Sequence, residues 1–376
     1  MCTENHTMVS EFFLLGFQSL HNLRILVFTS ILLAYIFILL GNLLIVILVS
    51  IDHQLQVPMF YFLKHLALVD LLFTTNIVPN MLHVILLAGG TITTTGCFIQ
   101  YCIHSLAVYT QSLILAVMSL DRYMAICQPL RYSSVMTPKL CLHLAFWSWA
   151  AGLFLSPSEF LLIFQLKFCS SNMIDHFFCD MAPFLILASS NKELIEWHDF
   201  AISFTLIFLP FLFIVLSYAC IFTTILQIST SSGRRKAFST CSTHLATVST
   251  HCGILVTVYV FTTKGESVLV NKLRALLYTV LTPFINPLLY SIRNQEFRKA
   301  INKLIHIVMK ASSSYDVPLI RLSSCHVYPN LMSLSPEKEV SSKDQISGFG
   351  YPDGQAVQET KAASKSHIAE KPVKGT

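Results

Sequence analysis

The stretch "MSLDRYMAIC", Met118–Cys127, places an acid and a base side by side at the end of a long uncharged segment. The 50 residues 71–120 contain no Asp, Glu, Lys or Arg. Because about one residue in four is charged in a soluble domain, a segment of this length predicts that lipid surrounds it. The charged pair then marks the point where this segment leaves the membrane.

The composition of the whole chain agrees with a membrane protein. Of its 376 residues, 54% are hydrophobic and 12% are charged, and the mean hydropathy is +0.63. With a net charge of +5 and no long basic run with interleaved aromatics, we expect no nucleic-acid partner. The 11 cysteines include no CxxC pair, which argues against a zinc ribbon or a redox motif. We expect neither a metal nor a cofactor.

Seven segments are long and apolar enough to cross a membrane, which takes about 20 residues for a core of roughly 30 Å. The turn-forming stretch "AGGTITTTG" at 88–96 divides the long uncharged segment in two. Each span must be helical, because lipid cannot satisfy open backbone hydrogen bonds. We therefore predict an all-α membrane protein, a seven-transmembrane helix bundle, with spans at 25–51, 58–87, 97–127, 140–158, 200–226, 237–263 and 275–292.

Lys and Arg in the loops predict the orientation of the bundle. Nine lie on one side and six on the other, which favours an extracellular tail at 1–24 and loop at 159–199, with the C-terminus in the cytoplasm. The glycosylation acceptor "NHT" at Asn5 agrees. Residues 293–310 predict an amphipathic helix lying on plasma-membrane lipid. Residues 311–376, rich in Ser, Lys, Glu and Gly, predict a disordered cytoplasmic tail.

Several motifs together resemble the odorant receptor family of rhodopsin-like G-protein-coupled receptors. They are "MSLDRYMAICQPLRY" (118–132), "GRRKAFSTCSTHL" (233–245), "PFINPLLYSIRN" (283–294), "PMFYFL" (58–63), "LALVD" (66–70) and "DHFFCD" (175–180). The resemblance covers residues from about 5 to 310, with each motif at the expected end of its helix. It implies a receptor and not an enzyme. Such a receptor binds a small volatile odorant and activates a stimulatory heterotrimeric G protein, which raises cyclic AMP.

At the cytoplasmic end, the resemblance implies that Arg122 is restrained in the inactive receptor and turns to receive the G protein on activation. The alternative interpretation of the charged pair is a simple anchor among lipid headgroups. The resemblance implies these coupling and activation residues: Asp121, Arg122, Tyr123, Tyr218, Lys236, His244, Asn286, Pro287 and Tyr290.

Asp70 is an acid inside an apolar span, which is costly in lipid and therefore a functional candidate. Polar neighbours such as Asn42 and Asn286 can satisfy its carboxyl group, and the resemblance makes this cluster part of the activation core. Odorant receptors usually carry a second acid where this chain has Gln111, so a tightly bound sodium ion is not implied. Pro287 removes a helix hydrogen bond and allows a kink in the seventh span.

The resemblance implies a disulfide between Cys97 and Cys179. Cys169 matches one half of a further pair, but Ser189 stands at the partner position, so Cys169 is expected to be unpaired. His176, Cys179 and Asp180 have the side chains of a soft-metal site. A disulfide at Cys179 would remove the thiolate that such a site needs.

The ligand is expected in the outer half of the bundle. Helical turns counted back from Asp121 place His104, Ser105, Val108 and Tyr109 toward the interior. The resemblance adds Ser203, Ile207, Leu255, Val256, Tyr259, Leu276 and Thr279. Apolar walls with a few polar groups suit a small volatile molecule. Ordinary helix packing is the alternative role for each of these residues.

Three other functions are weighed against the odorant receptor. A channel or transporter predicts internal repeats or a row of intramembrane charges, and Asp70 stands nearly alone. An intramembrane enzyme needs a nucleophile–base pair or a metal triad at membrane depth, and the polar residues lack that spacing. A degraded or poorly trafficked receptor stays open, because the tail is long and the chain departs from its relatives at Gln111, Ser189 and Cys252.

Overall fold

The computed structural model describes residues 9–18, 22–164, 172–188, 192–259 and 268–314. Six helices in this part of the chain are long and apolar enough to cross a membrane. They are α1 (Arg24–Ile51), α2 (Pro58–Leu87), α3 (Thr94–Cys127), α5 (Pro138–Phe164), the run from α7 to α8 (Glu193–Gln227) and the run from α10 to α11 (Val268–Arg293).

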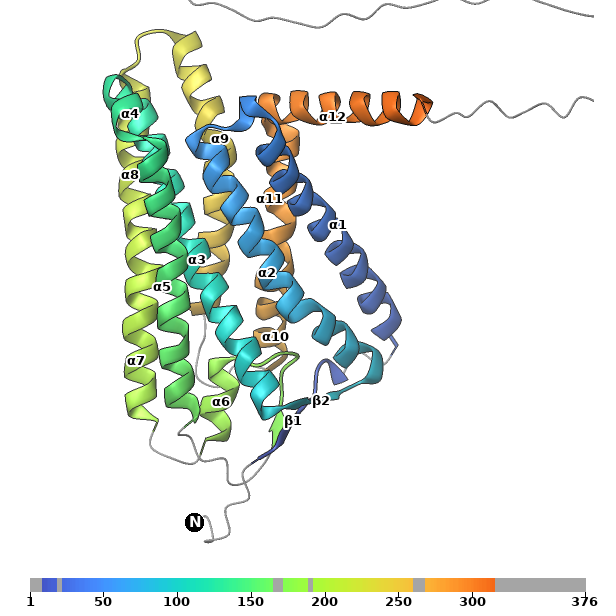
Figure 1. Cartoon of the computed structure of the whole chain (residues 1–376). Coiled ribbons are helices and arrows are strands. Elements are labelled where there is room, and N and C mark those ends of the chain that lie inside the picture. Colours follow the sequence, from blue (N-terminus) through green and yellow to red (C-terminus); the bar gives the residue numbers. More distant parts are fainter. Residues whose placement is uncertain (1–8, 19–21, 165–171, 189–191, 260–267, 315–376) are drawn as a thin grey trace, which may run out of the picture. The chain divides into compact units, whose positions relative to one another are not determined.

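A seventh helix, α9 (Ser231–Tyr259), packs against α3, α8, α10 and α11. Its 29 residues are enough to span a bilayer. Serine, threonine and histidine make it less apolar than the other six, but His244, Thr247 and His251 are buried. Because their polar groups face protein, the helix can lie at membrane depth. The chain therefore forms the expected seven-helix bundle (Figure 1).

Several helices extend beyond the spans expected from charge positions. The fifth begins at Glu193 and passes through α7 (Glu193–Ser203), a π-helical turn (Phe204–Phe208) and α8 (Leu209–Gln227). The seventh likewise joins α10 (Val268–Leu276), a second π-helical turn (Leu277–Leu281) and α11 (Thr282–Arg293). A charge marks the edge of the lipid, whereas the helical hydrogen-bond ladder continues past that edge.

The third, fourth and sixth helices also differ from their expected spans. The fourth runs to Phe164 with Pro157 inside it, so the outer loop is shorter than the expected 159–199. The third begins three residues early, at Thr94, where Thr93 caps the helix by accepting the Gly96 N–H at 3.1 Å. The sixth begins at Ser231 rather than at residue 237, and its expected last residues, 260–263, lie outside the described residues.

One end of the bundle, called here the sheet end, carries a three-stranded sheet that the sequence did not reveal (Figure 1). Strand β1 (Glu11–Leu14) lies between β2 (Gly90–Thr93), which is antiparallel to it, and β3 (Met173–Ile174), which is parallel. Part of the stretch expected to be only a turn thus forms a strand. The short helix α6 (Met181–Leu187) follows at the same end.

The opposite end, called here the α12 end, carries α4 (Pro129–Val135), a 3₁₀ turn (His53–Leu55) and α12 (Gln295–Ser314). Helix α12 is amphipathic, as expected: Phe297 is fully buried, whereas Lys299 pairs with Glu296 at 2.8 Å on an exposed face. Lys303 lies 3.4 Å from the Asp52 carboxylate at the 3₁₀ turn. The expected glycosylation site Asn5, the unpaired Cys169 with Ser189, and the tail from residue 315 lie outside the described residues.

Candidate functional sites at the two ends of the bundle

Asp121 and Arg122 form a buried ion pair on the last turns of α3, at the α12 end. Arg122 donates from Nε at 2.9 Å, and also from Nη2, to Oδ2 of Asp121. The side chains are part of the protein interior, since Asp121 is 0% and Arg122 is 7% exposed. Neither side chain therefore reaches outward to lipid headgroups.

Tyr132 of α4 completes this group, because its hydroxyl donates to Oδ1 of Asp121 at 2.8 Å. Burial, followed by the nearby Asp121 carboxylate, raises the pKa of Tyr132 well above its usual range. The hydroxyl therefore keeps its proton and stays a donor. Both oxygens of Asp121 are thus occupied, one by a guanidinium and one by a phenol.

A second contact at this end joins α8 to α9. The Tyr218 hydroxyl lies 2.7 Å from Nδ1 of His244, and both side chains are buried. Tyr290 of α11 belongs to the same apolar core as Tyr218 and is fully buried. Tyr123 is half-buried against that core, whereas Lys236 lies on the exposed face of α9. Five of the expected coupling residues, including the ion pair, thus lie in the interior of one end.

Asp70 is held by two amides in the middle of the bundle. Gln111 Nε2 donates to Oδ1 at 3.0 Å, and Asn286 Nδ2 donates to Oδ2 at 2.7 Å. Asn42 was expected in this cluster, but its Nδ2 instead donates to the carbonyls of Ile38 and Pro283. Helix α1 thus binds the backbone just before the NPLLY motif, and the Asp70 carboxylate accepts from Gln111.

Close packing against Pro287 accounts for one glycine in α1. A Cβ added to Gly41 would lie 2.8 Å from the Cβ of Pro287. Since real side chains do not approach so closely, α1 and α11 can meet here only through a glycine. Pro287 itself lies inside α11, next to the buried Asn286.

At the sheet end, His104 of α3 lies in an aromatic cluster. Four rings have centroids within 6.4 Å of its ring: Phe73 (5.5 Å), Tyr101 (6.4 Å), Phe178 (5.3 Å) and Tyr278 (5.7 Å). His104 Nε2 is 3.5 Å from the Tyr278 hydroxyl, and Nδ1 is buried with no hydrogen-bond partner among the described residues. This histidine thus combines apolar walls with one unused polar atom.

Other expected ligand residues surround this cluster. Val108, Tyr109 and Ile207 belong to the apolar core that contains Phe178 and Tyr278, and Leu276 packs against it. Thr279 is buried but donates to the Ala275 carbonyl at 2.7 Å, and Ser203 is half-buried. The side chains of Leu255, Val256 and Tyr259 lie outside the described residues.

Glu159 is a site residue that the sequence analysis placed in the outer loop. It lies inside α5 with 0% exposure. Its Oε2 accepts the Tyr101 hydroxyl at 2.7 Å, and its Oε1 accepts the Tyr109 hydroxyl. The signal was available, because an acid that directly follows an apolar span with no base beside it is expected to be buried with polar partners.

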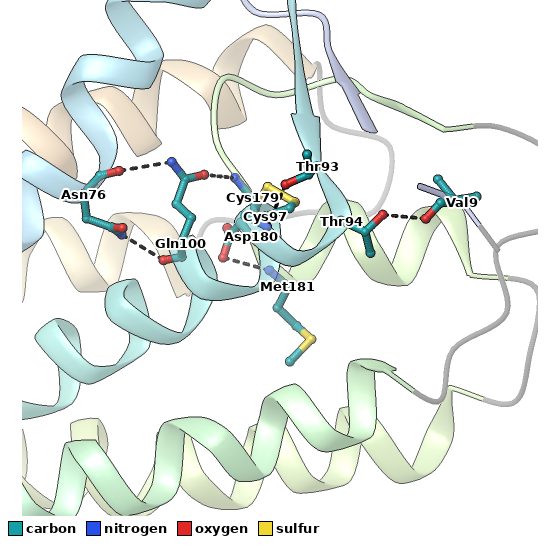
Figure 2. Close-up of a disulfide and its surroundings, with 10 residues drawn as sticks. Val9, Asn76, Thr93, Thr94, Cys97, Gln100, Cys179, Asp180 and Met181 are labelled. Atoms are coloured by element: carbon teal, nitrogen blue, oxygen red, sulfur yellow. Dashed lines mark hydrogen bonds between the residues drawn. A yellow bond between two sulfur atoms is a disulfide. The ribbon is translucent and has the colours of Figure 1, made fainter. Parts of the chain in front are cut away.

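The expected disulfide joins Cys97 of α3 to Cys179 of the outer loop, with the two Cα atoms 5.5 Å apart (Figure 2). Gln100, one turn further along α3, accepts the Cys179 N–H at 3.0 Å and donates to the Asn76 carbonyl at 3.1 Å. The Asn76 side chain returns a bond to the Gln100 carbonyl at 2.8 Å. The loop is thereby fixed to α3 and, through Gln100, to α2.

This disulfide also bears on the soft-metal site considered above. Its formation uses the Cys179 thiol, which leaves His176 and Asp180 without a sulfur ligand. Within the described ranges, no group of three or more His, Cys, Asp or Glu side chains is placed to hold a metal ion. The loop residues beside Cys179 instead serve packing, since His176, Phe177 and Phe178 contact one another through their rings.

Comparison with known proteins places the whole bundle in one family. A family model described as olfactory receptor matches residues 31–308. Olfactory receptor 6E1 of Mus musculus is 39% identical over 311 residues, which are 82% of this chain and 99% of that protein. Olfactory receptor 2AP1 of Homo sapiens is 38% identical over 308 residues, 81% of this chain and 100% of that protein.

The fold has a match among solved structures. Squid rhodopsin aligns with a TM-score of 0.59 at 17% identity, covering 75% of this chain and 85% of that structure. At this identity the likeness supports the seven-helix fold alone. The family match carries the assignment further, because it spans most of the chain and includes both sites described above. The chain belongs to the olfactory receptor family, whose members are receptors and not enzymes.

Proposed function

We propose that this chain is an odorant receptor of the plasma membrane. A small volatile organic molecule binds among the helices at the sheet end. Binding activates a stimulatory, olfactory-type heterotrimeric G protein at the α12 end, which raises cyclic AMP. Membership of the olfactory receptor family supports both classes of partner.

The ligand proposal is supported mainly by the side chains that surround His104. Aromatic rings supply apolar walls, and the free Nδ1 supplies a polar atom that can orient a ligand carrying a hydroxyl or carbonyl group. Tyr109 of α3, bound to Glu159 of α5, adds a second polar group. A buried polar atom without a partner is costly, so a ligand that satisfies it gains affinity.

The coupling proposal rests on the buried pair of Asp121 and Arg122. The guanidinium is bound to its neighbour in the chain, which is the restrained state of a two-state switch. Activation releases Arg122 for the G protein, while Tyr123, Tyr218, His244 and Tyr290 rearrange and Lys236 supplies charge on the exposed face of α9. The residues around Asp70, Asn286 and Pro287 link this end to the ligand site.

The orientation follows from the chemistry of the two ends. The sheet end carries the disulfide, which forms on the oxidising side of a membrane. The α12 end carries Arg131, Arg234, Arg235 and Lys236, which favour the cytoplasm. The N-terminus is therefore outside, and α12 lies on the lipid of the inner leaflet.

The test is a cyclic AMP assay in cells, with surface staining, over a broad panel of odorants. Arg122→Ala should abolish the response at unchanged surface staining. Arg131→Ala, which removes an exposed arginine of α4 at the same end, should preserve the response. A response that survives Arg122→Ala contradicts the coupling mechanism.

The alternative is a receptor-like protein that has the fold but little signalling or poor trafficking. Good surface staining of the unmodified chain with no response over the whole panel would favour it. If the unmodified chain instead stains poorly at the surface, truncation after residue 310 separates two causes of poor trafficking. Restored surface staining would place the fault in the tail, and unchanged staining would place it in the bundle.

A further inference from the structure

Lys272 of α10 is buried at the sheet end, with only 6% of its surface exposed. Its ammonium group pairs with the carboxylate of Asp175 in the outer loop and donates to the Gly16 carbonyl at 2.6 Å. Lysine is almost never buried unless it is paired, because an unpaired ammonium loses its hydration. This side chain therefore joins three segments: the N-terminal segment, the outer loop and the seventh helix.

The same segments are also joined through their backbones. The Gly16 N–H donates to the His176 carbonyl at 3.1 Å, and the Leu15 N–H donates to the Ile174 carbonyl at 3.0 Å. Gly16 has a φ of +59°, and a Cβ at this position would collide with the side chain of Val84. Because only glycine fits, the carbonyl of residue 16 is held in the direction of Lys272.

The part of the outer loop that meets the ligand site begins at Phe177, two residues after Asp175. Phe177 stacks on Phe17 of the N-terminal segment, with centroids 5.4 Å apart, and Phe178 lies 5.3 Å from the His104 ring. The next residue, Cys179, is fixed to α3 by the disulfide. The two phenylalanines thus lie between two anchors, Lys272 on one side and the disulfide on the other.

We propose that Lys272 is a positioning residue for odorant binding. Its ion pair with Asp175 and its bond to Gly16 hold Phe177 against Phe17 and Phe178 against His104, although Lys272 itself does not touch the odorant. The expected effect on ligand affinity rests on the proposed function, whereas the positioning of the loop can be measured without any ligand. Loss of the ion pair lowers the population of the held loop, and the apparent affinity falls by the same factor.

The first experiment is hydrogen–deuterium exchange on the purified full-length receptor. Lys272→Met and Asp175→Asn should each accelerate exchange in the peptides that contain Leu15, Gly16 and Cys179, whose amides are hydrogen-bonded in the native receptor. Lys192→Met is the matched control, because Lys192 lies at the same end but donates to the Leu185 carbonyl. Lys272→Arg keeps a cation that can pair with Asp175 and donate to the Gly16 carbonyl, and it should keep exchange slow.

The second experiment measures cyclic AMP dose–response curves with straight-chain aliphatic alcohols and aldehydes as single probes. Lys272→Met and Asp175→Asn should raise the half-maximal concentration about tenfold, with surface staining and maximal response retained. Lys272→Arg, which keeps the charged donor, should show little of this loss. A residue needed only for folding would instead lower surface staining.

Unchanged exchange in Lys272→Met overturns the proposal. Exchange in Lys272→Arg that is as fast as in Lys272→Met also overturns it, because the contribution would then come from packing and not from the charged donor. If no probe activates the unmodified receptor, the proposed function fails, whereas the exchange experiment still decides the role of Lys272. If exchange changes but the half-maximal concentration does not, the loop is positioned without a role in ligand binding, and the proposal is overturned.

Discussion

Tyr132 donates a 2.8 Å hydrogen bond to Oδ1 of Asp121, the carboxylate whose other oxygen binds Arg122. The phenol thus orients the acid that restrains the arginine. Tyr132 follows the DRY motif by nine residues, within the quoted stretch 118–132, but spacing alone did not assign it a role. Only the short helix α4 brings its hydroxyl back to α3.

This relationship predicts that Tyr132→Phe raises basal signalling. The substitution removes one hydrogen bond to a charged group, worth about 1.5–3 kcal/mol, and so weakens the restraint on Arg122. Basal cyclic AMP, normalised to surface staining, should rise several-fold. Tyr61→Phe is the control, because Tyr61 lies near the start of α2 at the same end, and the oxygens of Asp121 accept from Arg122 and Tyr132. Equal basal levels in the two variants would argue that Tyr132 does not support the restraint.

Among the described residues, the disulfide predicts a loss of stability when Cys97 or Cys179 is replaced. It links residues 82 apart in the sequence, and in the chain-entropy account closing such a loop stabilises the fold by about 4.5 kcal/mol. Cys97→Ser, Cys179→Ser and the double variant should therefore lower the thermal midpoint of the detergent-solubilised receptor to a similar extent. Cys102→Ser, which changes a free cysteine of the same helix, should not. Equal midpoints for all four variants would be inconsistent with this bond.

Gln111 predicts that sodium has no effect on the unmodified receptor. Its amide nitrogen occupies a position 3.0 Å from Asp70, where a cation would otherwise balance the carboxylate. Gln111→Asp replaces this donor with a second carboxylate, and two adjacent acids favour a bound cation. Exchanging potassium for sodium should raise the thermal midpoint of Gln111→Asp only. Gln111→Asn is the control, and a sodium effect on the unmodified receptor would contradict the prediction.

His176 predicts a loss of stability in acid. Burial lowers its pKa from 6.5 to about 4, so the folded protein holds the neutral ring while the unfolded chain binds a proton. The stabilising contribution of the neutral ring is therefore complete above pH 6.5 and is lost as the pH falls from 6.5 toward 4. Thermal midpoints over this window should fall less steeply in His176→Gln. The exposed His143→Gln should behave like the unmodified receptor, and parallel curves for all three would exclude His176 as a cause.

The sequence alone predicted the seven spanning helices, but not the short helices α4 and α6. Apolar segments of spanning length, bounded by charges, can only be helices in lipid, and this constraint acts on each segment separately. The motifs then located Arg122, Asp70 and the disulfide, because each stands at a recognisable place in its own helix. Even the burial of Glu159 could have been inferred, since an acid beside an apolar span needs partners.

The tertiary structure alone decided which distant groups meet. Strand β1 is too short to be recognised and forms only because two loops pair with it. Lys272 binds Gly16 across 256 positions in the sequence, and Asn42 binds the Pro283 carbonyl where Asp70 was expected. Hydropathy reports the surrounding solvent of each residue, whereas hydrogen bonds and ion pairs depend on how the packed helices and loops place individual atoms. The spans could therefore be predicted one at a time, but the partners of Lys272, Glu159 and Tyr132 could not.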